Sequence, residues 1–170
     1  MQLTMKNIFS SLLLILFVSV FSCCTKQQTL SPKEEIIPKL YYLSFKQDTL
    51  PVTLSITTAR KENVGSLFTT AIEGKLPDSI VRKNNLIVRV TGDSARAYAP
   101  SEIFASYTDS LGITYSNMIT DTVNKITITK MEKKKDGLVE GSFTIRVSNN
   151  TKTKTYLLKE GKFSTTFFDY

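Results

Sequence analysis

The sequence predicts an all-β protein, a single antiparallel β-sandwich or flattened barrel of about nine strands. Apolar and polar residues alternate with a period of two in several short stretches, which places one face of each stretch on a core and the other in water. Threonine is abundant and no long helical pattern occurs, in agreement with strand propensity. A lipocalin-like barrel is the alternative within the same fold class.

Five alternating stretches define expected strands, and turn residues separate them. The inward-facing residues of these stretches are, in chain order, Tyr41-Leu43-Phe45, Val52-Leu54-Ile56, Leu86-Val88-Val90, Ile126-Ile128 and Phe143-Ile145-Val147. The turn signals are Gly65, Gly74, Gly92-Asp93, Gly112, Asp136-Gly137 and Asn149-Asn150. Residues 101–107 fit either a helical turn capped by Ser101 or another strand.

The first residues of the chain are typical of an export signal. Lys6 supplies a positive charge, and residues 8–21 are apolar except for three serines. A helix that crosses a bilayer needs about 20 apolar residues, so this shorter run favours the core of a signal peptide. Ser22 followed by Cys23 resembles a lipobox, which implies that residues 1–22 are a lipoprotein signal peptide. Ordinary secretion and an uncleaved anchor are the alternatives.

The lipobox implies that Cys23 carries acyl chains and anchors the protein on membrane lipid. Each buried methylene contributes about 0.8 kcal/mol, so several chains hold the protein firmly. Cys24 is expected to be a bystander or the alternative site of lipidation. Residues 23–38 are interpreted as the lipidated cysteine and a flexible tether, because they are polar and lack alternation. Residues 39–170 form the predicted β domain.

The composition excludes most familiar catalytic chemistry. The chain has no histidine, which removes the usual general base and the commonest metal ligand. No cysteine follows Cys24, so the domain has neither a disulfide nor a zinc site built on Cys and His. No catalytic serine motif, phosphate loop or calcium loop is present. We therefore expect no catalytic residues, no metal, no cofactor and no enzymatic activity, with an unrecognised envelope hydrolase as the alternative.

The net charge of +7 suggests anionic neighbours. Lys130, Lys133, Lys134 and Lys135 lead into Asp136-Gly137, a strong hairpin signal, so these lysines are expected to decorate an exposed tip. They are also candidates for contact with an anionic surface. Nucleic acid is not an expected partner of an exported protein.

Three tyrosines are candidate ligand contacts. Tyr98, Tyr107 and Tyr115 lie in the less regular middle of the chain, where loops could present them to a ligand. Most other aromatic residues stand at alternating positions and are expected in the core.

The last third of the chain carries two Gly-x-Phe motifs, Gly141-Ser142-Phe143 and Gly161-Lys162-Phe163, after the strand at residues 125–131. Each glycine is expected at a bulge or at a close approach of another backbone, and the two phenylalanines are expected to pack across the core. This pattern resembles the closing three-strand meander of a family of small Bacteroidetes lipoproteins of unknown function. The resemblance implies an all-β fold and an envelope location, and no activity.

Surface-displayed lipoproteins of such bacteria tend to carry acidic residues close behind the lipidated cysteine. None directly follows Cys23, which favours the periplasmic face of the outer membrane over the cell surface. The sequence as a whole predicts a lipid-anchored, non-catalytic module that binds an anionic envelope polymer or a protein partner, or supports the envelope structurally. The alternative is a lipocalin-like carrier of a small apolar ligand.

Overall fold

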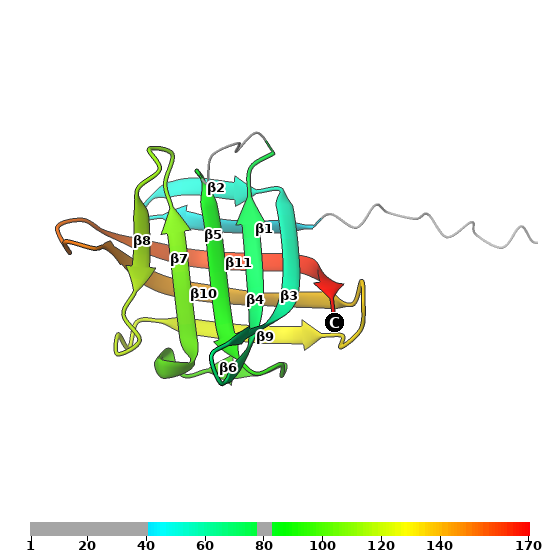
Figure 1. The fold of residues 1–170 in the computed structure, drawn as a ribbon. Coiled ribbons are helices and arrows are strands. Elements are labelled where there is room, and N and C mark those ends of the chain that lie inside the picture. Colours follow the sequence, from blue (N-terminus) through cyan, green and yellow to red (C-terminus); the bar gives the residue numbers. More distant parts are fainter. Residues whose placement is uncertain (1–40, 78–82) are drawn as a thin grey trace, which may run out of the picture. The chain divides into compact units, whose positions relative to one another are not determined.

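The computed structural model describes residues 41–77 and 83–170, which form two layers of β-strands (Figure 1). One layer contains β2 (Leu50–Leu54), β1 (Tyr42–Gln47), β11 (Thr155–Asp169), β10 (Leu138–Asn149), β9 (Lys125–Met131) and β6 (Ala97–Tyr98). The other contains β3 (Ile56–Val64), β4 (Leu67–Lys75), β5 (Asn85–Thr91), β7 (Ile103–Thr108) and β8 (Thr114–Asn117). We call them the back layer and the front layer, after the view of Figure 1. The predicted signal peptide, Cys23, Cys24 and the tether lie outside the described residues.

The all-β prediction is confirmed, with two corrections. The described residues contain eleven strands rather than about nine, in the order β2-β1-β11-β3-β4-β5-β7-β8-β10-β9-β6. The sheet is mixed rather than purely antiparallel, because β11 and β3 run parallel where Phe167 pairs with Ala59. The strands of the two layers run across one another in Figure 1, as in crossed sheet packings.

Two long strands connect the layers. β11 leaves the back layer at its C-terminal end to pair with β3, and β10 pairs with β8 of the front layer where Val147 faces Asn117. Within the back layer, β10 and β11 also pair with each other. Inward-facing aliphatic residues fill the space between the layers, among them Leu43, Leu54, Ile72, Leu86, Ile103, Ile145 and Leu158.

The two Gly-x-Phe motifs lie opposite each other in β10 and β11. Gly141 pairs with Phe163, and Phe143 pairs with Gly161. A Cβ atom at Gly161 would lie 2.5 Å from the ring of Phe143, and one at Gly141 would lie 2.5 Å from the ring of Phe163. Each ring therefore covers the glycine of the facing strand, and both rings are buried, as the sequence predicts. The register shifts beside this exchange, at Glu160, whose φ of 54° is left-handed.

Some sequence-based boundaries are wrong. Val52, Leu54 and Ile56 do not share one strand, since the chain leaves the back layer after β2 and begins β3 in the front layer. Ile56 is exposed as a result, whereas Leu54 is buried. Gly74 is no turn but lies within β4, where a Cβ atom would come within 3.0 Å of Leu43.

The connections before β7 and β10 add detail that the sequence left open. A short 3₁₀ turn, η1 (Pro100–Glu102), precedes β7, so most of residues 101–107 form the strand alternative. Asp136-Gly137 lies in the turn that joins β9 to the antiparallel strand β10, as predicted: the amide of Gly137 donates to the carbonyl of Lys134 at 2.9 Å. This turn also contacts β11. The amide of Asp136 donates to the carbonyl of Phe167 at 2.9 Å, and the amide of Phe167 donates to the carbonyl of Gly137 at 3.0 Å. These bonds tie the β9–β10 connection to β11.

The described strand order ends in two short edge strands. β2 carries Pro51, which has no amide proton to offer a further strand. β6 consists of only Ala97 and Tyr98. Every other described strand has a neighbour on both sides.

The Gly161–Phe143 contact gives a stability prediction. Gly161→Ala should lower the free energy of unfolding by about 1–3 kcal/mol, because overpacking forces the Phe143 ring or the backbone to move. Urea denaturation measures the change, with Ser142→Ala on the exposed face of β10 as the control. In a Phe143→Leu background the same glycine substitution should cost less, since the obstructing ring is gone. An equal cost in both backgrounds would contradict the assigned contact.

Candidate binding surfaces

The three candidate ligand-contact tyrosines lie on strands and not in loops. Tyr98 in β6, Tyr107 in β7 and Tyr115 in β8 are only 5%, 2% and 0% exposed. The hydroxyl of Tyr115 donates to Asp109 Oδ2 at 3.1 Å, and that of Tyr107 donates to Gln47 Oε1 at 2.8 Å. Burial is the largest cause that raises the pKa of Tyr107 and of Tyr115 to about 12. All three belong to the core, out of reach of a ligand on an outer face.

An aromatic cluster fills the space between the layers near these tyrosines. The ring centroids of Phe45 and Tyr107 are 5.7 Å apart, and those of Phe45 and Phe143 are 6.1 Å apart. Tyr115 and Tyr156 approach to 4.7 Å, and Tyr107 lies 6.2 Å from Tyr115. Aromatic pairs at these separations contribute about 0.5–1.5 kcal/mol each beyond their buried area. This part of the interior is occupied by side chains.

The four predicted surface lysines are exposed in or next to the β9–β10 connection, as the sequence predicts. They are Lys130, Lys133, Lys134 and Lys135. Two of them are ion-paired: Lys130 with Glu132 at 2.9 Å and Lys133 with Asp93 at 3.0 Å. Within residues 41–77 and 83–170, Lys134 and Lys135 have no acidic group within 4.0 Å. The positive charge of this connection is thus partly compensated, and its contact with an anionic surface stays a prediction.

A second group of basic residues crosses the outer face of the back layer. Lys125 in β9 pairs with Thr144 in β10. Thr144 lies opposite the bulge of β11 at Lys159 and Glu160, and Lys159 pairs in turn with Lys46 of β1. Neighbouring strands lie about 4.8 Å apart, so this basic row spans roughly 14 Å.

A row of hydroxyl groups runs beside the basic row on the same face. Thr127 pairs with Ser142, Ser142 with Lys162, Lys162 with Ser44, and Ser44 with Thr53. Lys162 stands in the middle of this hydroxyl row, two residues from the bulge. The two rows place lysine residues next to serine and threonine residues across β9, β10, β11 and β1.

A groove of about 410 Å³ lies where the two rows meet. It exists because β10 presents the short side chains of Ser142 and Thr144 between the longer ones of Lys125 on β9 and Lys162 on β11. The remaining lining residues are Thr127, Phe143, Glu160 and Gly161.

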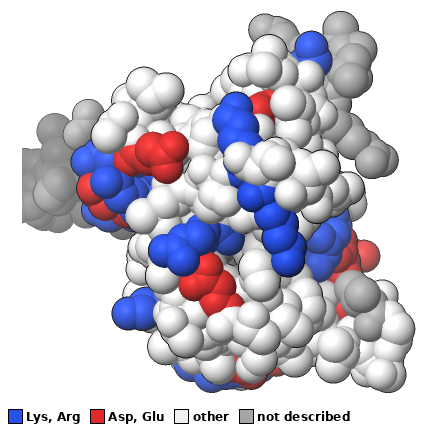
Figure 2. Space-filling view, turned by 90° about the vertical axis from the view of Figure 1, so that its left-hand side faces the viewer, with Lys and Arg blue, Asp and Glu red and all other residues white. Residues whose placement is uncertain are grey.

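Acidic residues neutralise only part of this face. Lys46 pairs with Glu160 at 2.6 Å, and Arg146 on β10 pairs with Asp121 at 3.1 Å. Figure 2 views the domain from the end where the β10–β11 hairpin projects and shows Lys and Arg side chains there beside Asp and Glu side chains. The sequence could have predicted this group from the polar positions of the alternating stretches. The order in which the strands pair brings those positions together, and no single stretch of sequence predicts that order.

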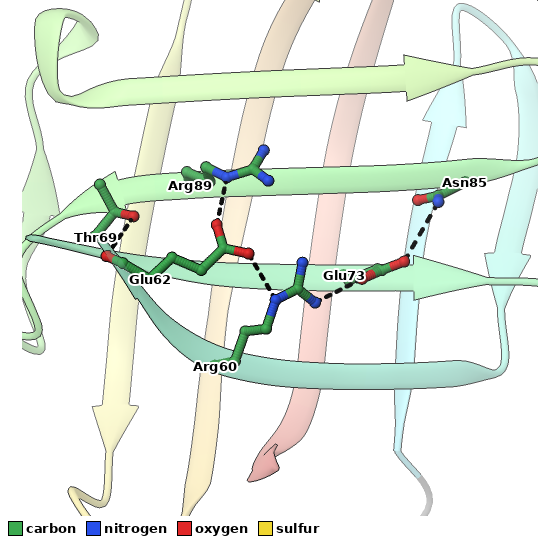
Figure 3. Close-up of polar contacts among 6 residues, drawn as sticks. All are labelled: Arg60, Glu62, Thr69, Glu73, Asn85 and Arg89. Atoms are coloured by element: carbon green, nitrogen blue, oxygen red, sulfur yellow. Dashed lines mark hydrogen bonds and ion pairs between the residues drawn. The ribbon is translucent and has the colours of Figure 1, made fainter. Parts of the chain in front are cut away.

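The outer face of the front layer has a different character, since a chain of hydrogen bonds links its charged residues from Arg89 to Glu73 and Asn85 (Figure 3). Glu62 on β3 accepts hydrogen bonds from Arg60 Nε at 2.6 Å and from Arg89 Nε at 2.7 Å. Arg60 Nη1 donates to Glu73 at 2.7 Å, and Asn85 Nδ2 donates to the other oxygen of Glu73 at 3.4 Å.

The network covers the backbone of β4. Ala71 pairs with Arg60 on one side and with Arg89 on the other, and it is fully buried although it faces outward. Burial alone raises the pKa of Glu62, but the hydrogen bonds from Arg89 and Arg60 outweigh it, so the pKa of Glu62 is lowered.

Beside the network lies a hollow of about 340 Å³, lined by Leu67, Thr69, Arg89 and Phe104. Its lining is mostly apolar.

In comparisons with known proteins, no family model, no curated protein and no solved structure matches the chain. In the described part of the chain, no helix is long and apolar enough to cross a membrane. The described residues also contain no group of three or more His, Cys, Asp or Glu that could hold a metal ion. The resemblance to small Bacteroidetes lipoproteins stays a prediction.

The network on the front layer gives a second prediction. Glu62→Gln should lower the free energy of unfolding at pH 7 by about 1–3 kcal/mol, because it weakens two charge-assisted hydrogen bonds of a side chain that is only 20% exposed. The pKa of Glu62 lies below its ordinary value of 4.5, so this stabilisation is complete above about pH 4.5 and is lost as the pH falls through the lowered pKa.

Urea titrations of the wild type and of Glu62→Gln at several pH values test this dependence. Glu160→Gln, which changes an exposed ion pair, is the matched control and should leave stability nearly unchanged. A Glu62→Gln deficit that is the same at pH 7 and at pH 3 would show that the ion pairs do not cause it.

Proposed function

We propose that the chain is a membrane-anchored bacterial lipoprotein whose β domain is a non-catalytic binding module of the cell envelope. Anchoring rests on the sequence: the apolar run and Ser22-Cys23 resemble a lipoprotein signal, with Cys23 as the acylated residue. The lack of acidic residues directly behind Cys23 favours the periplasmic face of the outer membrane. The anchor keeps the domain close to the envelope polymers and proteins that it would bind.

The filled interior is the observation that supports a binding module over a carrier. A lipocalin-like carrier needs an apolar cavity between its layers. Here Phe45, Tyr107 and Tyr115 pack against one another in that space, and the hydroxyls of the two tyrosines are already hydrogen-bonded. The grooves that the described residues form at Thr69 and at Ser142 lie on outward-facing strand positions. The outer faces are therefore the surfaces on which a partner would bind.

The charge network supports a role without catalysis. A general acid at neutral pH needs a carboxyl group whose pKa is raised towards 7. The pKa of Glu62 is instead lowered, because Arg89 and Arg60 stabilise its ionised form. Such a carboxylate suits the stabilisation of the sheet.

Replacement of Cys23 tests the anchor. Cys23→Ser should move the protein from the membrane fraction to the soluble fraction and abolish its labelling by a palmitate analogue, because serine cannot form the thioether. Cys24→Ser is the matched control and should remain membrane-bound and labelled. If Cys23→Ser stays membrane-bound and only Cys24→Ser is released, the acylated cysteine has been misassigned. If both variants stay in the membrane fraction unlabelled, the lipoprotein proposal is wrong.

A further inference from the structure

The outer face of the back layer combines hydroxyl groups with an excess of positive charge over the acidic groups paired with it. Its basic residues are Lys46, Lys125, Arg146, Lys159 and Lys162. Glu160 and Asp121 are the acidic residues paired with them, at 2.6 and 3.1 Å, so three of the five positive charges have no such partner. Lys46 and Lys159 face each other directly across β1 and β11, and the carboxylate of Glu160 next to them forms its ion pair with Lys46.

The shape of this face fits an extended partner. The basic row and the hydroxyl row run side by side across β9, β10, β11 and β1, and the groove of about 410 Å³ lies between Lys125 and Lys162. Thr127, Ser142 and Thr144 line it with hydroxyl groups, which can both donate and accept hydrogen bonds. A partner that follows the rows would meet alternating charge and hydroxyl groups.

We infer that this groove binds an acidic polysaccharide, a chain of hydroxyl-rich sugar units that carry carboxylate or phosphate groups. The inference rests on the binding role proposed above and names its partner. The lysines attract the anionic groups as point charges, and the threonine and serine hydroxyls bond the sugar hydroxyls directly or through water. The sheet backbone fixes the order of the residues in both rows.

An acidic polysaccharide fits this face better than a lipid surface does. Proteins that lie on an anionic membrane combine basic side chains with an exposed apolar face that enters the lipid. The two rows present lysine, serine and threonine outward, while the apolar neighbours Phe45 and Phe143 point into the core. Membrane adsorption through this face is therefore an alternative that the experiment must separate.

Affinity electrophoresis of the full chain in neutral detergent tests the site. We expect polygalacturonate or phosphomannan in the gel to retard the protein, and neutral dextran to leave its mobility unchanged. Polyglutamate carries the same kind of charge without sugar hydroxyls and should bind more weakly. Vesicles that contain phosphatidylglycerol form the membrane arm, measured by co-sedimentation. Added salt should weaken binding, since exposed charges are screened within about 10 Å at 0.1 M.

Charge substitutions in the groove should act in opposite directions. Lys125→Gln combined with Lys162→Gln should weaken binding about fivefold, whereas Glu160→Gln should strengthen it about twofold because Lys46 loses its partner. The matched control is Lys75→Gln combined with Lys83→Gln, which removes the same charge from exposed positions at the end of β4 and before β5 and should change the affinity less than twofold. Circular dichroism of each variant checks that the fold is retained.

Several outcomes would overturn the inference. They are failure of both acidic polysaccharides to bind, equal binding of polyglutamate, or an equal effect of the control pair. Preference for the vesicles with the same dependence on Lys125 and Lys162 would assign the face to a membrane. None of these results bears on whether Cys23 is acylated, so the anchor proposal stands or falls separately.

Discussion

Phe143 and Phe163 each lie over the glycine of the facing strand, and this exchange determines how closely β10 and β11 can approach. A side chain at Gly141 or Gly161 would collide with the facing ring. The two rings instead pack on bare backbone and bury themselves in the core. β10 and β11 also reach the front layer, through β8 and β3, so the two strands that connect the layers meet at this contact.

The two outer faces use charge in different ways. On the front layer, Glu62 accepts hydrogen bonds from Arg60 and Arg89, so these charges pair with one another. Their side chains cover β4 and keep water from it. On the back layer, Lys46 and Lys159 face each other beside the bulge at Glu160, and the carboxylate of Glu160 forms an ion pair with Lys46. The first arrangement stabilises the sheet. In the second, lysine side chains without an ion pair can attract an anionic partner.

Much of the fold follows from alternation, since Leu86 and Val88, for example, are buried as their spacing predicts. Alternation failed at Ser55, where the period of two continues although the chain changes layers. It also left residues 101–107 open between a helical turn and a strand, so it did not place Tyr107 in the core. The sequence could not predict the groove either. Lys46 and Lys125 are far apart in the chain, and only the pairing order of β1, β11, β10 and β9 brings them into one row.

Under the lipid anchor proposed for Cys23, the short edges of the sheet would matter. Proteins held on a membrane diffuse in two dimensions, meet copies of themselves often and share a restricted range of orientations. An open strand edge under those conditions would invite pairing from one molecule to the next. Pro51 removes a donor from β2, and β6 is too short to guide another strand. Neither described edge would therefore offer a neighbouring copy on the membrane a long strand with which to pair.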